Sequence, residues 1–135
     1  LKRDGVAFIS VMNFELTNHI AKHRFRIKQN PNMLLDLKAS NIMETTGDIF
    51  NPEFLMIDED DHLIYRKEQF VSGRELPIEL IVREKRFSMD EIIKMCTEVG
   101  FRVDETSYVS AKDWNSTLNS IDPHAKEILI KCSKK

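Results

Sequence analysis

The stretch FSMDEIIKMCTEVGF, residues 87–101, carries the start and stop signals of a helix. Ser88, with Glu91 three residues later, predicts a capping box: the Ser88 hydroxyl accepts from the Glu91 N–H, and the carboxylate returns to the Ser88 N–H. The apolar positions that follow recur at helical spacing, and Gly100 suits the left-handed residue after a helix. We therefore predict a helix over residues 89–99 that leads into a strand.

Strands are predicted on both sides of this helix. VAFISVM, residues 6–12, is a continuous apolar run typical of a strand buried on both faces of a parallel sheet. RVDETSYV, residues 102–109, follows the helix, and a loop with Trp114 comes next. The chain ends on EILIKC, residues 127–132, a second apolar strand that must be covered.

The middle of the chain predicts a smaller β region. A weakly amphipathic helix is expected from Glu15 to about Arg26, and MLLDLKASNIM, residues 33–43, reads as a short helix within an irregular segment. Two strands around an acidic turn are expected in residues 54–71, and a third in residues 76–87. Together these three strands predict an antiparallel meander.

Composition indicates an ordinary soluble domain. The 135 residues suffice for one core, 41% are hydrophobic and 31% charged, so we expect a single domain or a domain fragment. The net charge of −2 provides no general attraction for nucleic acid. A local basic cluster at Lys22, Arg24, Arg26 and Lys28 leaves a nucleic-acid enzyme half as a third hypothesis, against the alternative of a solvated helix end.

The cysteines and the N-terminal sequence indicate in which cellular compartment the protein is expected. Cys96 and Cys132 have no zinc-ligand spacing and are predicted to be reduced, buried thiols. No apolar run is long enough for a membrane span, and the N-terminus lacks a signal peptide's pattern, so we expect a cytoplasmic protein. Because the chain begins at Leu1 instead of Met, we expect a processed chain or a fragment.

The stretch LKRDG, residues 1–5, comes directly before the first apolar run, and the capped-helix unit of residues 87–101 comes later. In this order, the two motifs resemble the C-terminal half of class I S-adenosylmethionine-dependent methyltransferases. Leu1-Lys2-Arg3-Asp4-Gly5 is similar to the LKPGG-like turn before the family's fifth strand, with Arg for Pro and Asp for Gly. Phe87-Ser88-Met89-Asp90-Glu91 and Glu98-Val99-Gly100-Phe101 are similar to its (Y/F)(S/T)xEE…GF helix. Each motif alone is generic, and their order along the chain carries the resemblance.

The resemblance implies an α/β fold, the C-terminal part of a Rossmann-like methyltransferase sheet. The family's fifth strand would be residues 6–12, its sixth would lie near residues 102–109, and its antiparallel seventh, residues 127–132, would be inserted between them. The antiparallel meander would belong to an inserted lid over residues 29–87. The match covers residues 1–135 in order, although the insert matches only as a variable region.

The sequence departs from the family at the cofactor site. The family binds S-adenosylmethionine at a Gly-rich loop after its first strand and at an acidic residue that ends its second. This chain has four scattered glycines and neither feature. The resemblance therefore implies that the cofactor is bound mainly by residues not present in this chain, and we assign no cofactor-binding residue here.

Substrate-binding residues are expected at Asn13, Phe14, Glu15 and Tyr65. The first three follow a strand of the sheet, where α/β proteins bind ligands, and Tyr65 lies on the insert. The alternatives are that Asn13 caps the next helix and that Phe14 and Tyr65 pack in the core.

No catalytic residue or metal site is predicted. A general base for methyl transfer would come from Glu15, His19 or His23, without a preference among them. His19 and His23 lie one turn apart, but two ligands without a third indicate a solvated helix face.

Two function classes follow from these observations. The first is the C-terminal portion of a methyltransferase that acts on a small-molecule acceptor, inactive alone, with a missing N-terminal half on the same or a partner chain. The alternative is a non-catalytic interaction or dimerisation module, because the apolar strand over residues 6–12 would leave an unpaired edge for a partner chain or a homodimer.

Overall fold

The computed structural model divides the chain into two compact units, and each is described by itself. The first unit comprises Leu1–His19 and Arg86–Lys135, and the second comprises Ile20–Lys85. The expected single domain and the expected lid boundaries stay predictions. The structure describes residues 2, 4–20, 39–43, 56–70 and 78–135.

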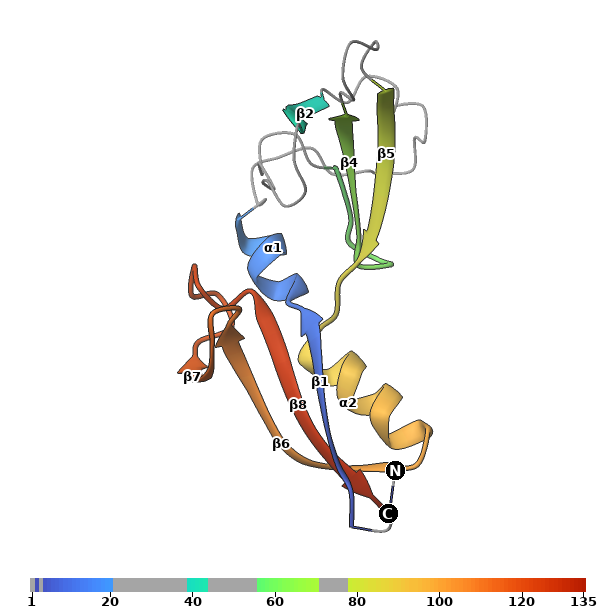
Figure 1. Ribbon diagram of the computed structural model, residues 1–135, viewed down its shortest axis with the longest axis vertical. Helices are drawn as coiled ribbons and strands as arrows, with labels where there is room; N and C mark the ends of the chain where they lie inside the picture. Colours follow the sequence, from blue (N-terminus) through green and yellow to red (C-terminus); the bar gives the residue numbers. More distant parts are fainter. Residues whose placement is uncertain (1, 3, 21–38, 44–55, 71–77) are drawn as a thin grey trace. The chain divides into compact units, whose positions relative to one another are not determined.

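A four-stranded sheet forms the framework of the first unit (Figure 1), in the order β1-β8-β6-β7. Strand β8 pairs antiparallel with both β1 and β6, so β1 and β6 run in the same direction. The prediction that the terminal strand lies between the other two, antiparallel to both, is confirmed. The strands are β1 (Val6–Met12), β6 (Phe101–Ser110), β7 (Asp113–Leu118) and β8 (Glu127–Lys134).

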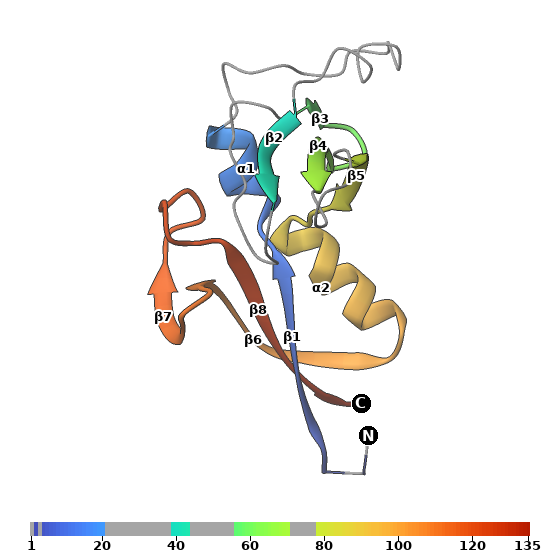
Figure 2. The same cartoon turned by 45° about the horizontal axis from the view of Figure 1, so that its top comes forward.

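Helix α2 (Met89–Glu98) covers one face of this sheet (Figures 1 and 2). Its Ile92 and Cys96 join Ile128, Ile130 and Cys132 of β8 in one buried cluster. The three β8 side chains are fully buried, at 0% exposure. The prediction that the terminal strand is covered is therefore confirmed, and burial of these apolar groups holds the unit together.

Strand β1 is less buried than its sequence predicted. Val6 is 48% exposed and Phe8 58%, whereas Ile9 and Val11 pack against the core cluster. The expectation of burial on both faces is wrong. Helix α2 covers only the face that carries Ile9 and Val11, and residues alternate between the faces of a strand, so Val6 and Phe8 point away from the core.

The predicted helix signals act as expected. The Ser88 hydroxyl accepts from the Glu91 N–H at 3.2 Å, and Gly100 adopts a φ of 90°. The Val99 N–H closes the helix on the Met95 carbonyl at 3.2 Å. The Ser88 contact satisfies a backbone N–H that the helix itself leaves open, and the two helix ends lie near where the sequence predicted them.

The segment after β6 contains a strand where a loop was expected. Trp114 belongs to β7, which pairs antiparallel with β6 across Tyr108↔Leu118 and Ser110↔Asp113. The polar sequence DWNSTL has no apolar alternation, so pairing with β6 decides its conformation. A turn follows β7 at Asp122, where the Ala125 N–H donates to the Asp122 carbonyl at 2.9 Å.

The second unit is built around β4 (Figure 1). Strands β3 and β5 pair with it antiparallel, as the predicted meander requires, and the turn before β4 is closed on Asp58 Oδ1 by the N–H groups of Asp60 and Asp61. Strand β2 pairs with β4 in parallel, so the helix expected over residues 33–43 is wrong for its described part. The strands are β2 (Ala39–Met43), β3 (Met56–Asp58), β4 (Leu63–Phe70) and β5 (Ile78–Lys85).

Helix α1 (Phe14–Ile20) follows β1 directly. It starts one residue before the predicted Glu15, and the rest of the predicted helix, residues 21–26, lies outside the described residues. In the described part of the chain, no helix has both the length and the apolar character needed to cross a membrane.

Candidate functional site

The candidate site lies at the carboxyl ends of β1 and β6. Asn13 follows β1 and forms an isolated parallel bridge with Phe87, which precedes α2. The Phe14 N–H donates to the Phe87 carbonyl at 2.9 Å, and the Phe87 N–H donates to the Met12 carbonyl at 3.0 Å. These bonds bring the N-termini of α1 and α2 to the same edge of the sheet, the edge where ligands bind in open α/β sheets.

Asn13 organises this edge from a buried position, at 1% exposure. Its Nδ2 donates to the carbonyls of Ser120 and Ala125, both at 2.8 Å. Its Oδ1 accepts from the N–H groups of Glu15 at 3.0 Å and Leu16 at 3.4 Å, so it caps α1. The amide thus joins the end of β1, the start of α1 and the loop before β8.

Glu15 and Tyr108 connect the two same-direction strands of the site. The Tyr108 hydroxyl donates to Glu15 Oε2 at 2.9 Å. Burial raises the pKa of Tyr108 above its usual value, and the hydrogen bond to Glu15, the charge of Glu15 and the charge of Asp90 raise it further. Tyr108 is therefore a neutral donor at physiological pH, and among the described residues Glu15 Oε1 accepts no hydrogen bond.

The buried Arg86 stabilises the same edge of the sheet through a hydrogen bond to α1. Arg86 is 6% exposed, and its Nη1 donates to Thr17 Oγ1 at 2.6 Å. Thr17 in turn donates to the Asn13 carbonyl at 3.1 Å. This chain of bonds ties the segment before α2 to the first turns of α1, and so holds Glu15 in a defined position.

The predicted site residues divide between the two units. Asn13, Phe14 and Glu15 lie together at the sheet edge, with Phe14 buried at 5% exposure. Tyr65 lies on β4 of the second unit, half-buried, opposite Met56 and Arg83. The substrate roles of all four stay predictions.

The other predicted polar positions have mixed outcomes. His19 is exposed near the end of α1. His23 and the basic cluster of Lys22, Arg24, Arg26 and Lys28 lie outside the described residues. Within the described residues, no group of three or more His, Cys, Asp or Glu side chains is placed to hold a metal ion.

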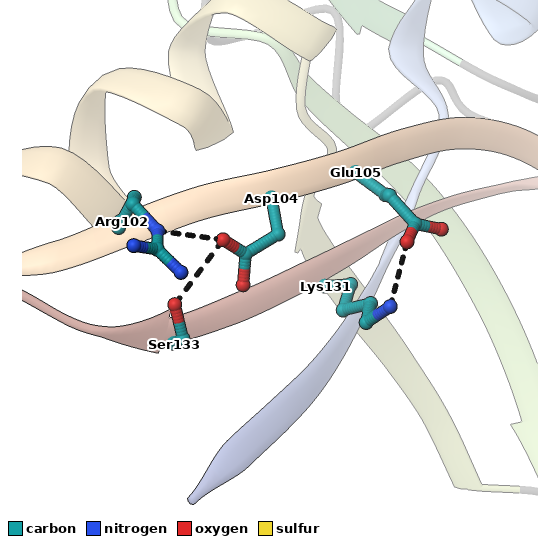
Figure 3. Close-up of polar contacts among 5 residues, drawn as sticks. All are labelled: Arg102, Asp104, Glu105, Lys131 and Ser133. Atoms are coloured by element: carbon teal, nitrogen blue, oxygen red, sulfur yellow. Dashed lines mark hydrogen bonds and ion pairs between the residues drawn. The ribbon is translucent and has the colours of Figure 1, made fainter. Parts of the chain in front are cut away.

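The face of the first sheet opposite α2 carries a different kind of surface. Lys131 on β8 donates to Glu105 on β6 at 2.6 Å, and Asp104 accepts from Arg102 at 2.8 Å and from Ser133 at 3.2 Å. Figure 3 shows these contacts. The hydrogen bond from Arg102, then that from Ser133, lowers the pKa of Asp104. The hydrogen bond to Glu105 raises the pKa of Lys131.

A shallow groove of about 320 Å³ crosses this face beside the ion pair. Its walls include Phe8 and Trp114, and Leu129 lies within its lining. The Trp114 Nε1–H donates to Glu127 Oε2 at 2.9 Å, and the Ser10 hydroxyl donates to the same oxygen at 2.7 Å. The groove is thus a mixed polar and aromatic surface and not an enclosed site.

The two cysteines meet in the core. Cys96 and Cys132, 3% and 0% exposed, belong to the same cluster and are both free thiols. Burial raises the pKa of Cys132 to about 11, and the hydrogen bond with Cys96 contributes in the same direction. A protonated, enclosed thiol is a poor nucleophile, so Cys132 is not suited to covalent chemistry, and both cysteines are the buried thiols that the sequence predicted.

Comparison with known proteins places the fold. No protein-family model matches the chain, and no curated protein matches it in sequence. It is similar in structure to an S-adenosylmethionine-dependent methyltransferase from Clostridium acetobutylicum ATCC 824, with a TM-score of 0.51 and 10% identity. The similarity is one of fold. It covers 96% of this chain and 44% of the other, so the chain spans less than half the length of that methyltransferase.

Neither Tyr108 nor Arg86 was identified from the sequence as a residue of this site. The strand that contains Tyr108 was predicted, and Tyr108 lies two residues before its end, at the same edge as Glu15. Its position near the carboxyl end of a strand was the available signal. The pairing with Glu15 depends on residues 93 positions apart, which no local pattern contains.

Proposed function

We propose that this chain is the C-terminal portion of an S-adenosylmethionine-dependent methyltransferase that acts on a small-molecule acceptor. It contributes one side of the sheet, the carboxyl edge with Glu15, and a lid formed by the second unit. Alone it is inactive, because the residues that bind the cofactor belong to another segment or chain.

The strand arrangement is the observation that carries the proposal. Two same-direction strands, β1 and β6, enclose an antiparallel strand that comes last in the chain. This order is the one that the resemblance implies for the fifth, seventh and sixth strands of the family. The structural similarity to a methyltransferase, over 96% of this chain, supports a methyltransferase-like fold.

The absence of a glycine-rich motif supports the proposal that another segment or chain binds the cofactor. A Gly-rich turn lets backbone N–H groups approach a ligand closely. The four glycines of this chain are scattered at Gly5, Gly47, Gly73 and Gly100, and Gly100, with a φ of 90°, terminates α2 from the position after its C-cap. S-adenosylmethionine would therefore be bound by the part of the fold that this chain lacks.

We assign Glu15 the role of contacting the methyl acceptor. Its carboxylate is oriented by the neutral Tyr108 hydroxyl, which leaves Oε1 to accept a proton or a hydrogen bond from a substrate hydroxyl or amine. Asn13 and Phe14 position the Glu15 carboxylate by fixing the backbone before it. The Asn13 side chain is already hydrogen-bonded and Phe14 is buried, so neither side chain is assigned a direct contact with the acceptor. Alignment of acceptor and methyl donor supplies most of the catalysis that methyl transfer needs.

The second unit is proposed to close over the acceptor. Its strand β5 exposes Ile78, Leu80 and Ile81 at 58%, 49% and 46%. An exposed apolar strand of this kind fits a surface that is covered when a ligand or another segment is present. Tyr65, on the neighbouring strand β4, would contribute from this unit.

The test compares the 135-residue chain with the intact protein from its source. The intact protein is expected to bind S-adenosylmethionine by calorimetry and to transfer its methyl group, and the 135-residue chain is expected to do neither. In the intact protein, Glu15→Gln should lower turnover roughly 10²-fold while cofactor affinity stays unchanged. Glu98→Gln, the same substitution at an exposed position of α2, is the matched control.

Each outcome decides a separate part of the proposal. An intact protein that binds no cofactor overturns the methyltransferase assignment. Tight binding by the 135-residue chain overturns the claim that the missing segment carries the site. Equal effects of the two substitutions overturn the role of Glu15.

A non-catalytic interaction module is the second candidate function. Its specific support is β1, an apolar strand that, in the described part of the chain, pairs with one other strand, β8, and meets Phe87 only at its Met12 end. An interaction module would keep its partner affinity and show no cofactor binding even as the intact protein.

A further inference from the structure

The face of the first sheet opposite α2 arranges its side chains in rows that the strand register sets. Lys131 of β8 lies opposite Glu105 of β6, and on its other side it lies opposite Phe8 of β1. The next row on this face holds Leu129 of β8 and Ser107 of β6. Both rows line the shallow groove of about 320 Å³, together with Trp114 and Asn115 of β7.

The indole ring of Trp114 is held in place by β8. Its Nε1–H donates to Glu127 Oε2 at 2.9 Å, and the Ser10 hydroxyl donates to the same oxygen at 2.7 Å. Hydrogen bonds to a carboxylate are stronger than those between neutral groups. The ring therefore keeps one orientation while Trp114 is 48% exposed, and it loses little conformational freedom when a ligand packs against it.

The groove combines exposed aromatic side chains with an apolar base. Phe8 is 58% exposed, as the second aromatic group of the lining, and Leu129 lies between the strands at 9% exposure. Exposed aromatic groups that line a concave surface are more typical of a ligand site than of a solvated sheet face. Such groups pack against the flat apolar side of a ligand, and a few polar side chains then fix its orientation.

The charged groups of the groove neutralise one another. Lys131 donates to Glu105 at 2.6 Å, a contact drawn in Figure 3, and the two side chains are 35% and 70% exposed. A ligand with a net charge would be attracted by one partner and repelled by the other. A covering chain segment would remove water from the ion pair, which costs free energy. A small neutral ligand with hydroxyl groups avoids both effects, because the ammonium group has further donors and the carboxylate further acceptor positions.

We propose that this groove binds a neutral carbohydrate. The C–H side of a sugar ring is flat and apolar, and it packs against the indole of Trp114 and the ring of Phe8. Sugar hydroxyls both donate and accept, so they bond with the Lys131–Glu105 pair and with the amide of Asn115.

The size and place of the groove agree with this ligand. Its volume is at the lower end of the range for ligand pockets, about 300–1,000 Å³, which fits a mono- or disaccharide. Neither Glu15 nor Tyr108 belongs to its lining. The inference therefore goes beyond the proposed function and does not rest on it.

Fluorescence titration of the 135-residue chain tests the proposal, because Trp114 is its single tryptophan. The probes are the methyl glycosides of glucose, galactose, mannose and N-acetylglucosamine, together with cellobiose. At least one of them is expected to change the emission saturably, with a Kd of about 0.1–10 mM. The Kd should stay the same up to about 0.5 M salt, because ions do not screen the contacts of a neutral ligand.

Two matched variants locate the binding site. Phe8→Ala should raise the Kd roughly three- to tenfold, because the sugar loses one aromatic contact. Met95→Ala, at a position of α2 with 45% exposure, is the control and should leave the Kd within about twofold. Trp114→Ala should abolish binding, which saturation-transfer NMR of the sugar measures because this variant has no fluorophore. Circular dichroism of each variant checks that the fold is kept.

Four results would overturn the proposal. The first is that no probe gives a saturable change up to about 50 mM. The second is tighter binding of glucuronate, glucosamine or benzyl alcohol than of every neutral sugar, which would indicate a charged or a purely apolar ligand. The third is an equal effect of Phe8→Ala and Met95→Ala. The fourth is binding by the 135-residue chain that the intact protein lacks, since another segment would then cover the groove. None of these results bears on cofactor binding by the intact protein, so the proposed function is decided by its own test.

Discussion

The two faces of β8 show how one strand divides the first unit into a core and a surface. Ile128, Ile130 and Cys132 point toward α2 and are fully buried, whereas Lys131 and Ser133 point to the other face and bond across to β6. Side chains alternate between the two faces along the strand, and what covers each face sets their environment; Leu129 is the one residue of the second face that is also buried, at 9% exposure. Stability should therefore depend strongly on the α2 face and weakly on the open one.

The largest effect is expected from a cavity on the α2 face. Ile130→Ala should lower the free energy of unfolding by about 2–5 kcal/mol, because it removes buried apolar contacts and leaves a void. Urea unfolding measures the change. Ile130→Val, which removes one methylene group, should cost only about 0.5–1.5 kcal/mol. A loss below about 1 kcal/mol for Ile130→Ala would show that this face is not the main core.

A second effect on the same face depends on pH. The pKa of Cys132 is raised from 9.0 to about 11 by burial and by the hydrogen bond with Cys96, so the folded state favours the neutral thiol. This contribution to stability is complete below pH 9, where both states are protonated, and falls as the pH rises toward 11, because the unfolded chain loses its proton first. Unfolding measured across this range should show a downward slope.

The matched variant for the pH effect is Cys132→Ala. Lysines and tyrosines also titrate above pH 9, so the difference in slope between the two proteins isolates the thiol. Equal slopes would mean that Cys132 ionises as easily in the folded chain as in the unfolded one.

A smaller effect is expected where α2 begins. Ser88→Ala should cost about 1 kcal/mol, because the Glu91 N–H loses its acceptor at the helix start. Thermal unfolding measures it. Ser107→Ala, on the open face of β6, is the control and should change stability by less than about 0.5 kcal/mol. Similar losses at both positions would argue against a specific role of the cap.

The smallest effect is expected on the open face. Lys131→Ala should leave the midpoint of urea unfolding almost unchanged, since its ion pair with Glu105 is exposed and the attraction is weakened by solvent. Any measurable difference should disappear in about 1 M salt. A clear loss of stability that persists at high salt would mean that this face is covered in solution.

Local patterns predicted the elements that carry strong signals. The apolar runs of β1 and β8 and the capped helix α2 were recognised because burial and capping impose a residue type at each position. Strand β7 was missed, because DWNSTL is polar and becomes a strand through pairing with β6. Ala39–Met43 was misread for the same reason, since its conformation depends on β4.

The candidate site was predicted only in part. Asn13 and Glu15 were identified from their place after an apolar strand, and the capping role of Asn13 was the recognised alternative. Tyr108 and Arg86 were not identified, because their partners, Glu15 and Thr17, are far away in the sequence. A hydrogen bond between distant segments leaves no periodic pattern in either of them.

The sequence by itself determined which segments form the core strands and where α2 starts and stops, because side-chain polarity and backbone capping act within a few residues. The tertiary structure alone decided which face of each strand is covered, that Cys96 meets Cys132, and that Glu15 meets Tyr108. These contacts join residues that only the pairing of β1, β8 and β6 brings together. Only the folded chain specifies these contacts, because their energies depend on distance in space and not on separation along the sequence.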